Sequence, residues 1–265
     1  MPKNPNDAFT AATSVDVSVI LPIYRNADTV RELKDRLART LSDAGETFEI
    51  LFVNDACPAG SLDVLKQLAR EDPRVKVLAL ETNIGQHRAV LAGLRRTRSD
   101  WVIIMDADLQ DPPEAIPGLL ERARKGVDVV FAGRRGQYES TGRLFTSRLF
   151  KRTLAWLCNL PADAGMFMVA SRKAATQVSA MGGKRPFVVA MIGCTGLPMA
   201  SIPVERSPRP RGESAYGPWG RFDHGLRAVI WSLGYKLGLH RARYETLEPS
   251  PLSGQPSDPV GRKNG

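Results

Sequence analysis

The chain has 265 residues and a formal net charge of +9, and 43% of its residues are hydrophobic. A chain of this size can bury one large core, and its basic excess favours an anionic partner such as a phosphorylated substrate, an acidic membrane surface or a nucleic acid. The three cysteines, Cys57, Cys158 and Cys194, lack C-x-x-C spacing, which argues against a disulfide framework and a zinc site. We expect a cytoplasmic protein, because residues 1–14 carry no secretory signal and no apolar run is long enough to span a membrane.

Strands and helices alternate through residues 17–105. Apolar runs predict strands at 17–21, 48–53, 75–80 and 101–105, and apolar residues at helical spacing predict helices at 28–41, 62–69 and 89–94. We expect Pro22 to stop the first strand and Asp28 to cap the first helix. Because the strands are almost continuously apolar, both faces of the sheet should be covered. The pattern predicts an α/β fold with a Rossmann-like, mostly parallel sheet flanked by helices.

The second half of the sequence is less regular. It predicts a helix at 114–125, then a strand that includes 127–131 and ends at Arg134. A helix at 144–157, a strand at 166–170 and apolar segments at 187–192 and 200–204 follow. An amphipathic helix is expected within 221–240, with basic residues beside its apolar face. We divide the chain into a flexible leader at 1–14, a main domain at 15–216, a basic amphipathic helical segment at 217–243 and a disordered tail at 244–265.

Carboxylates gather directly after the predicted strand at 101–105. Asp106 and Asp108 stand one residue apart, and Asp111 follows shortly after them. Two such carboxylates at a buried strand end repel each other unless a hard cation lies between them. Ligands of parallel sheets bind beyond the carboxyl ends of the strands, where this chain also has polar residues at Tyr24, Asp55 and 83–87. The sequence therefore predicts a site for a divalent metal at this edge.

Five segments match one known family in the family's own order. They are Val17 to Asn26 (VSVILPIYRN), Phe52 to Asp55 (FVND), Asn83 to His87 (NIGQH), Asp106 to Glu114 (DADLQDPPE) and Arg209 to Ser214 (RPRGES). With these segments the chain resembles the inverting family 2 glycosyltransferases of the GT-A fold. Among them, it is similar to the polyprenyl-phosphate sugar transferases related to dolichol-phosphate mannose synthase. The resemblance covers roughly residues 15–216, and DADLQDPPE is its most specific segment.

The resemblance implies transfer of a sugar from a UDP- or GDP-sugar to a polyprenyl phosphate, an acceptor that would bring the protein into peripheral contact with the inner face of the membrane. It implies metal coordination by Asp106, Asp108 and Gln110, with the donor diphosphate as the remaining ligand, and catalytic roles for Asp108, Asp163 and Arg134. The residues matched to donor and acceptor binding are Pro22, Tyr24, Asp55, Gln86, Arg134, Arg143, Ser147 and Arg209. The chain departs from the family's pattern at Cys57, Ala59 and Ala215, and its sequence predicts none of the transmembrane helices that many relatives carry.

The chemistry of sugar transfer fits these residue types. Oxygen ligands suit Mg²⁺ or Mn²⁺, and the metal with the arginines would stabilise the negative charge that builds on the leaving diphosphate. A phosphate acceptor is already largely ionised near neutral pH, its second pKa being about 6, whereas a hydroxyl acceptor needs a base, for which Asp163 is the candidate. Two alternatives stay open. One is a soluble hydroxyl acceptor with the same fold and donor, and the other is a nucleic-acid-binding module, suggested only by the charge.

Simpler structural roles are also open to these residues. Asp106 and Asp108 can be solvated loop acids, Asp55 can cap the helix that follows it, and Asp163 can form a turn before a glycine. His87 can support its loop. The arginines can be surface cations, and Ser147 can be a hydroxyl on a helix surface. The apolar face within 221–240 can pack on the domain instead of touching a membrane.

Overall fold

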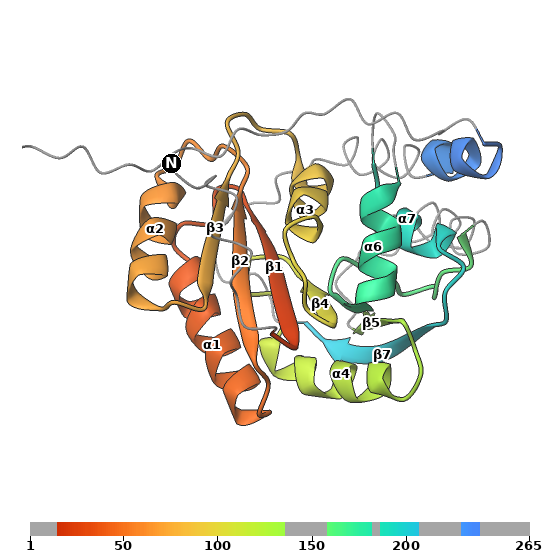
Figure 1. Ribbon diagram of the computed structural model, residues 1–265, viewed down its shortest axis with the longest axis horizontal. Coiled ribbons are helices and arrows are strands. Elements are labelled where there is room, and N and C mark those ends of the chain that lie inside the picture. The colour runs from red at the N-terminus through yellow and green to blue at the C-terminus, as the bar shows by residue number, and fades with distance from the viewer. Residues whose placement is uncertain (1–14, 136–157, 182–185, 207–228, 239–265) are drawn as a thin grey trace, which may run out of the picture.

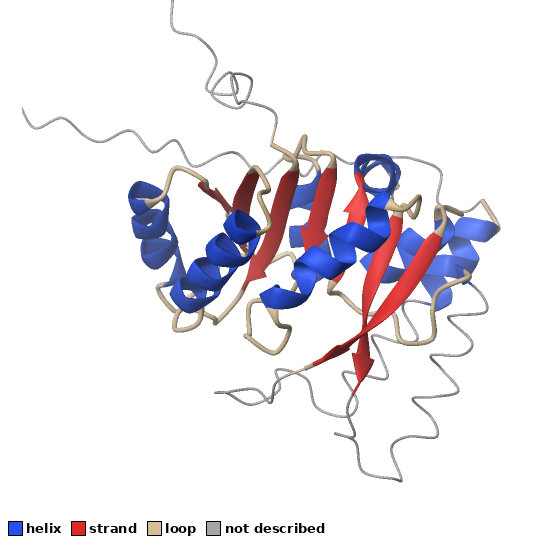
Figure 2. Ribbon diagram, turned by 90° about the horizontal axis from the view of Figure 1, so that it is seen from below, coloured by secondary structure: helices blue, strands red, loops and turns tan. Residues whose placement is uncertain are grey.

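The computed structural model describes residues 15–135, 158–181, 186–206 and 229–238 (Figure 1). They form a seven-stranded sheet with the strand order β3-β2-β1-β4-β6-β5-β7, and helices cover both of its faces (Figure 2). The predicted leader at 1–14, the predicted helix at 144–157 and the predicted tail at 244–265 lie outside the described residues.

The first half of the chain builds a parallel sheet, as the sequence predicts. Its strands are β1 (Val17–Ile23), β2 (Phe48–Asn54), β3 (Val75–Ala79) and β4 (Trp101–Ile104), and its helices are α1 (Val30–Asp43), α2 (Ser61–Glu71) and α3 (Gln86–Leu94). β1 pairs in parallel with β2 and with β4, and β2 pairs in parallel with β3. The loops that follow these four strands therefore share one edge of the sheet.

The second half of the chain adds three strands, one of which is reversed. A 3₁₀ turn, η2 (Pro113–Ala115), and α4 (Ile116–Arg124) lead to β5 (Val129–Arg135), and later come β6 (Met168–Ser171), α6 (Arg172–Ala180), α7 (Val188–Cys194) and β7 (Met199–Glu205). β6 runs antiparallel to both β4 and β5, whereas β5 and β7 are parallel. The sequence did not indicate α6, whose N-cap hydroxyl on Ser171 accepts a hydrogen bond from the Ala174 N–H at 3.2 Å.

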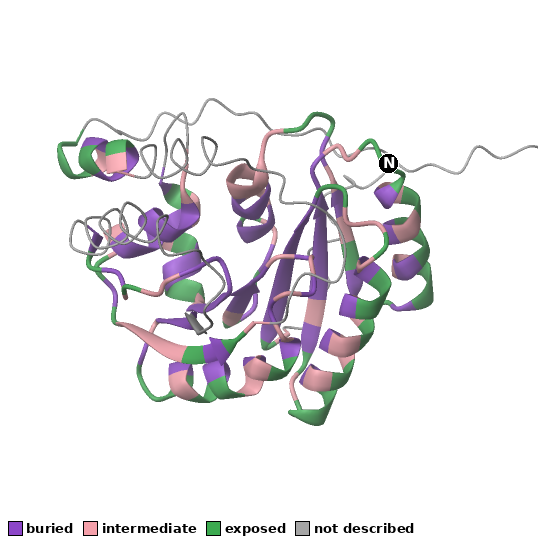
Figure 3. Ribbon diagram, turned by 180° about the vertical axis from the view of Figure 1, so that it is seen from behind, coloured by how far each residue is buried: buried purple, intermediate pink, exposed green. Residues whose placement is uncertain are grey.

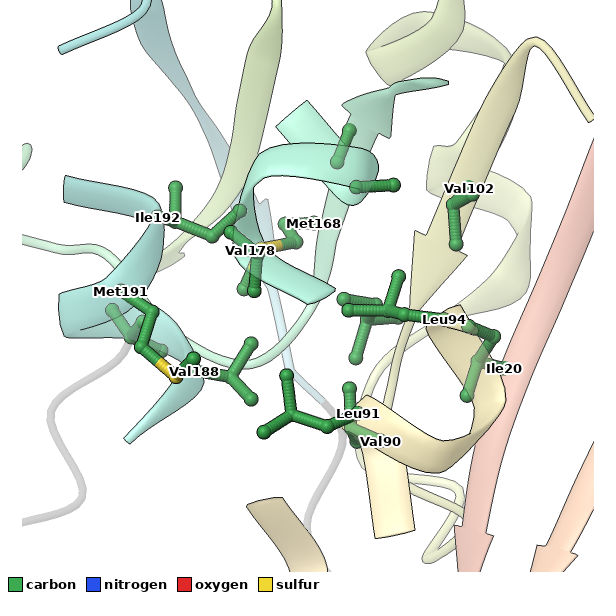
Figure 4. Close-up of a cluster of buried hydrophobic side chains, with 14 of the residues drawn as sticks. Ile20, Val90, Leu91, Leu94, Val102, Met168, Val178, Val188, Met191 and Ile192 are labelled. Carbon is green, nitrogen blue, oxygen red and sulfur yellow. The ribbon is translucent and has the colours of Figure 1, made fainter. Parts of the chain in front are cut away.

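Two hydrophobic clusters hold the helices against the sheet. One contains apolar side chains of α1, α2 and α4, and the other contains those of α3, α6 and α7. In the second cluster, Leu94 of α3 lies toward Ile20 of β1, and Leu91 lies toward Val188 of α7 (Figure 4). Figure 3 shows the strands buried between helices whose outer sides are exposed. The covered faces explain why the strands are almost continuously apolar.

Two boundaries predicted for the first strand and helix are wrong. Pro22 does not stop β1, which continues to Ile23. β4 accompanies β1 only as far as Ile20, so the later part of β1 is bonded on the β2 side alone and tolerates a residue without an N–H. α1 begins at Val30, and its N-cap residue is Thr29 instead of Asp28.

The C-terminal helical segment is described over residues 229–238. Trp231 and Ser232 are buried, and Trp231 belongs to the hydrophobic cluster of α3, α6 and α7. By contrast, Ile230, Leu233 and Leu237 are 60%, 44% and 72% exposed. The segment therefore docks through Trp231, and part of the apolar face predicted from the sequence is turned to solvent. No helix within the described ranges has both the length and the hydrophobicity that a bilayer span requires.

Candidate active site

The polar residues that follow the parallel strands meet at one edge of the sheet. Asp55 comes directly after β2, residues 83–86 lie between β3 and α3, and Asp106 follows β4 closely. β5 runs in the same direction as β4, because both are antiparallel to β6, so Arg134 near its end lies at this edge too. The predicted convergence of polar groups is thus confirmed for the described residues.

Asp55 organises the loop between β3 and α3. Its carboxylate, 3% exposed, accepts hydrogen bonds from the backbone N–H groups of Ile84 at 2.7 Å and Gly85 at 2.9 Å. Gly85 is the N-cap residue of α3 and has a φ of 86°, which an L-residue rarely adopts. Asp55 therefore fixes the start of α3, and not the start of α2, which follows it in the sequence. Its predicted place in a nucleotide pocket stays a prediction.

Gln86, the first residue of α3, connects that loop to the acids after β4. Its side-chain amide donates a hydrogen bond to Oδ1 of Asp106. The sequence assigned Gln86 to substrate binding and Asp106 to a metal, and in the structure the two side chains contact each other. The hydrogen bond orients the Asp106 carboxylate at the sheet edge, since α3 itself is held by Asp55.

Residues 106–110 are here called the acidic loop. Two hydrogen bonds and one left-handed residue shape its main chain. The Thr29 hydroxyl donates to the carbonyl oxygen of Ala107 at 2.6 Å. Leu109 has a left-handed φ of 61°, and Oδ1 of Asp108 accepts a hydrogen bond from the Gln110 N–H at 3.1 Å. The loop therefore turns tightly around Asp108 and is tied to the start of α1. Thr29 was not predicted for this role, because it lies far from the acidic loop in the sequence.

The residues of the acidic loop fit a hard divalent cation. Asp106, Asp108 and Gln110 offer carboxylate and amide oxygens, which suit Mg²⁺ or Mn²⁺. Across the ranges that the structure describes, no group of three or more His, Cys, Asp and Glu side chains is placed to hold a metal by itself. The protein ligands would thus be few, and a bound substrate would have to supply further oxygen ligands.

Asp111, the third acid of the run, has a different partner. Its two oxygens accept hydrogen bonds from Nε of Arg206 at 2.5 Å and from Nη2 at 2.9 Å. The carboxylate side chain is 4% exposed and the arginine side chain 17% exposed. Both oxygens of Asp111 are therefore engaged by one guanidinium. The sequence contained no sign of this pair, because its members belong to distant segments.

Asp163 lies against the backbone of β5 near the same edge. A Cβ atom added at Gly133 would meet Oδ2 of Asp163 at 2.0 Å and the Ser201 hydroxyl oxygen at 2.4 Å. The Ser201 hydroxyl is buried and finds no hydrogen-bond partner among the residues that the structure describes. Gly133 therefore makes room for the Asp163 carboxylate directly before Arg134. For Arg134 the structure gives the main chain in β5, while Arg143, Ser147 and Arg209 lie outside the described residues.

The segments after β1 and β2 touch each other at the expected nucleotide side. Tyr24 is 40% exposed, and the Arg25 guanidinium lies 5.3 Å from the centre of its ring. Sγ of Cys57 accepts a hydrogen bond from the Arg25 N–H at 3.1 Å. Burial raises the pKa of the Cys57 thiol, but hydrogen bonds from the Ser61 hydroxyl and from nearby backbone N–H groups outweigh it, so the pKa lies below its usual value. Pro22 is buried within β1 and pairs with Val53.

His87 has a structural role. Its Nδ1 accepts a hydrogen bond from the Val188 N–H at 3.4 Å, and its ring lies 4.5 Å from that of Phe187. These contacts tie α3 to the start of α7. They agree with the simpler reading of His87 as a residue that supports its surroundings.

Comparison with known proteins decides the family. The model of the family described as Glycosyl transferase family 2 matches residues 18–179. The chain belongs to this family. An undecaprenyl-phosphate 4-deoxy-4-formamido-L-arabinose transferase of Edwardsiella ictaluri is 34% identical over 204 residues, which are 76% of this chain and 63% of that protein. The uncharacterized glycosyltransferase YkcC of Bacillus subtilis is 30% identical over 205 residues, 76% of this chain and 64% of its own length. The chain thus spans less than two thirds of these two family 2 relatives.

Solved structures confirm the GT-A fold predicted for this family 2 member. A mannosyltransferase from Pyrobaculum calidifontis, in complex with GDP-mannose and Mn²⁺, has a TM-score of 0.61 at 14% identity and covers 88% of this chain and 67% of its own. A glucosyl-3-phosphoglycerate synthase from Mycobacterium tuberculosis, in complex with Mn²⁺, UDP and glucosyl-3-phosphoglycerate, has a TM-score of 0.59 at 20% identity and covers 88% and 82%. At these identities the likeness concerns the fold.

Proposed function

We propose that this family 2 member is a metal-dependent, inverting glycosyltransferase that moves a sugar from a UDP- or GDP-sugar to a polyprenyl phosphate. The observation that carries the proposal is the pair of acids in the acidic loop, held at the carboxyl edge of the sheet. Thr29 fixes the main chain beside them and Gln86 orients Asp106. Such a preorganised pair of carboxylates is what a site for a divalent cation and a diphosphate requires.

The proposed roles follow from where charge changes during sugar transfer. Asp106, Asp108 and Gln110 would hold Mg²⁺ or Mn²⁺, which when bound supplies positive charge to the diphosphate oxygens. Asp55 keeps the loop between β3 and α3 beside this site, and Tyr24 and Pro22 would line the nucleotide pocket. Arg134, Arg143, Ser147 and Arg209 would bind the phosphates of donor and acceptor. Asp163 would lie near the sugar, at the end of β5.

A phosphate acceptor is supported by relatives such as the Edwardsiella ictaluri protein, whose name gives undecaprenyl phosphate as its acceptor. A phosphate oxygen is already largely ionised near neutral pH, its second pKa being about 6, so no strong base is needed. Contact with the cytoplasmic side of a membrane is supported by the exposed apolar side chains of Ile230, Leu233 and Leu237 beside Lys236. Replacing all three by serine should reduce sedimentation with vesicles that contain anionic lipid.

A hydroxyl acceptor is the second candidate, and the placement of Asp163 favours it. Its carboxylate lies at the carboxyl edge, against Gly133, where a base for a hydroxyl would be needed. Two solved neighbours with the same fold are named as synthases of mannosyl- and glucosyl-3-phosphoglycerate. Asp163→Asn separates the two candidates: it should nearly abolish transfer to a hydroxyl and leave transfer to a phosphate less affected.

The test begins with the binding of nucleoside diphosphates. A ligand that binds only the folded chain raises its melting temperature, so UDP and GDP are compared with and without Mn²⁺. Release of nucleoside diphosphate from the matching sugar donor is then measured with and without a polyprenyl phosphate. Asp108→Ala should abolish both the metal-dependent stabilisation and the release, whereas Asp43→Ala, which removes an exposed acid at the end of α1, should change neither. Turnover at full rate in EDTA would contradict the proposal.

A further inference from the structure

We infer that Arg206 is a positioning residue for the metal site: through Asp111 it fixes the end of the acidic loop and thereby sets how tightly the cation is held. The inference rests on the proposed function, since it assumes that the acidic loop binds a divalent metal. Arg206 itself would touch neither the metal nor the substrate. It acts through a carboxylate that directly follows the proposed metal ligand Gln110.

The geometry of the pair suits such a role. Nε and Nη2 of Arg206 each contact a different oxygen of Asp111, so the planar guanidinium fixes the carboxylate in orientation as well as in position. Asp111 is 3% exposed, so water competes little for these hydrogen bonds. A buried, bidentate arginine pair of this kind holds its partner far more firmly than a surface ion pair does.

The pair also connects two parts of the fold that share no backbone pairing. Asp111 follows β4 by way of the acidic loop, and Arg206 directly follows β7. β6 and β5 separate β4 from β7 in the sheet. β7 is itself firmly held, because it pairs with β5 from Met199 to Glu205. Arg206 thus connects the end of the acidic loop to the end of β7, a strand that does not neighbour β4 in the sheet.

The contact of Arg206 with Asp111 adds to the contacts that shape the acidic loop. Thr29 holds the loop near its start at Ala107, and Asp108 holds the Gln110 N–H in the middle. Gln110 makes this contact and directly precedes Asp111. A shift of Asp111 would therefore move Gln110 and loosen the turn around Asp108. Metal ligands lose affinity when the residues that orient them are removed.

Charge gives the pair a second effect. With both oxygens on Arg206, Asp111 is kept away from the cation, which leaves Asp106 and Asp108 as the carboxylates of the proposed site. Removing the guanidinium would take a directly bonded positive charge away from a buried carboxylate. If Arg206 served only to restrain a competing ligand, its removal would strengthen metal binding. If it positions the loop, its removal weakens metal binding, so the two roles predict opposite signs.

The chain offers a matched control close by. Arg36 of α1 makes the same forked contact with Glu114, at 3.0 and 2.7 Å. Glu114 lies in η2, shortly after Asp111, but its side chain is 56% exposed, against 4% for Asp111. Arg36→Gln therefore removes an arginine of equal geometry near the acidic loop without uncovering a buried charge.

The experiment measures the Mn²⁺ concentration that gives half of the full thermal stabilisation by the preferred nucleoside diphosphate, UDP or GDP, in the full chain. For Arg206→Gln we expect this concentration to rise about tenfold, the lower end of what loss of an orienting residue does to metal affinity. Arg206→Lys, which keeps the charge but loses the fork, should show a smaller rise, and Arg36→Gln should stay within about twofold of wild type. The Mn²⁺ dependence of transfer should shift in parallel, with kcat at saturating Mn²⁺ changing less.

Two results would overturn the inference: equal Mn²⁺ requirements for Arg206→Gln and Arg36→Gln, or tighter Mn²⁺ binding by Arg206→Gln. Should Arg206→Gln not fold, the double variant Asp111→Asn/Arg206→Gln, which removes both charges of the pair, takes its place with the same expected rise. If the wild-type chain shows no Mn²⁺-dependent binding of any nucleoside diphosphate, the proposed function is refuted, and the inference is refuted with it. If the wild-type chain binds a nucleoside diphosphate with Mn²⁺ and the Arg206 variants need no more Mn²⁺ than it does, only the inference is refuted and the proposed function stands.

Discussion

The contact between Asp55 and the start of α3 leads to a quantitative prediction. In Asp55→Ala, the N–H groups of Ile84 and Gly85 lose a shared acceptor that binds them at 2.7 and 2.9 Å. Hydrogen bonds to a charged group contribute about 1.5–3 kcal/mol each, so the free energy of unfolding should fall by about 3 kcal/mol or more. Asp55→Asn keeps one acceptor oxygen and should lose about half as much.

Urea unfolding at pH 7 measures these differences, with Asp43→Ala as the control, expected within about 0.5 kcal/mol of wild type because its side chain is exposed. A second readout follows from the position of Gln86, which is the first residue of α3 and donates to Asp106. Once α3 is no longer fixed at its start, Mn²⁺-dependent stabilisation by a nucleoside diphosphate should weaken as well. A loss below about 1 kcal/mol in Asp55→Ala would refute the view that this carboxylate holds the loop.

Three further predictions concern single residues. Gly133→Ala places a methyl group 2.0 Å from Oδ2 of Asp163, so we expect a loss of about 1–3 kcal/mol in urea unfolding; Gly118→Ala in α4, which meets open space, should instead be neutral or slightly stabilising. Cys57 is partly exposed and its thiol pKa is lowered, so it should be alkylated by iodoacetamide faster than Cys158 at pH 7.5, as peptide mass spectrometry can measure. The hydrogen bond with Cys194 lowers the pKa of the Cys158 thiol to about 7, but Cys158 is only 1% exposed, so equal rates would contradict its burial. The Arg74 guanidinium lowers the pKa of Asp72 from 3.8. A lowered pKa stabilises the folded state above the unfolded-state pKa, so Asp72→Asn should cost about 0.5–1 kcal/mol at pH 7, and this cost should be lost as the pH falls through the folded-state pKa. A difference that did not shrink as the pH was lowered below 3.8 would argue against the ion pair.

Local sequence patterns predicted most of the fold for identifiable reasons. Strands covered on both faces are continuously apolar, and the helices between them bury one side, so both elements leave a periodic signal. α6 (Arg172–Ala180) was missed because it buries small side chains such as Ala174 and Ala175, which give little hydrophobic contrast. The end of β1 was misjudged at Pro22, because the missing pairing with β4 beyond Ile20 is a property of the sheet and not of the local sequence.

The candidate site, like the fold, could be predicted only in part. Acids that follow strands could be predicted to converge, because the carboxyl ends of parallel strands share an edge. The contacts that hold those acids could not be predicted. Thr29 meets Ala107 across 78 positions and Asp111 meets Arg206 across 95 positions, and no local pattern marks such pairs. Asp55 was expected to cap the nearer helix in its simpler role, and the structure shows it at α3 instead.

The reversed direction of β6 has a consequence for how this architecture can diversify. The residues that follow a parallel strand lie at the edge of the sheet that carries the candidate site. For β6, which is reversed, the residues that precede it lie at this edge, including Asp163 and Gly165. The segment that enters β6 can therefore change in length and sequence without altering the β1–β4 unit, whose loops carry Asp55, Asp106 and Asp108. Changes beside Asp163 and changes in the acidic loop would then be separable, because they fall in different parts of the chain.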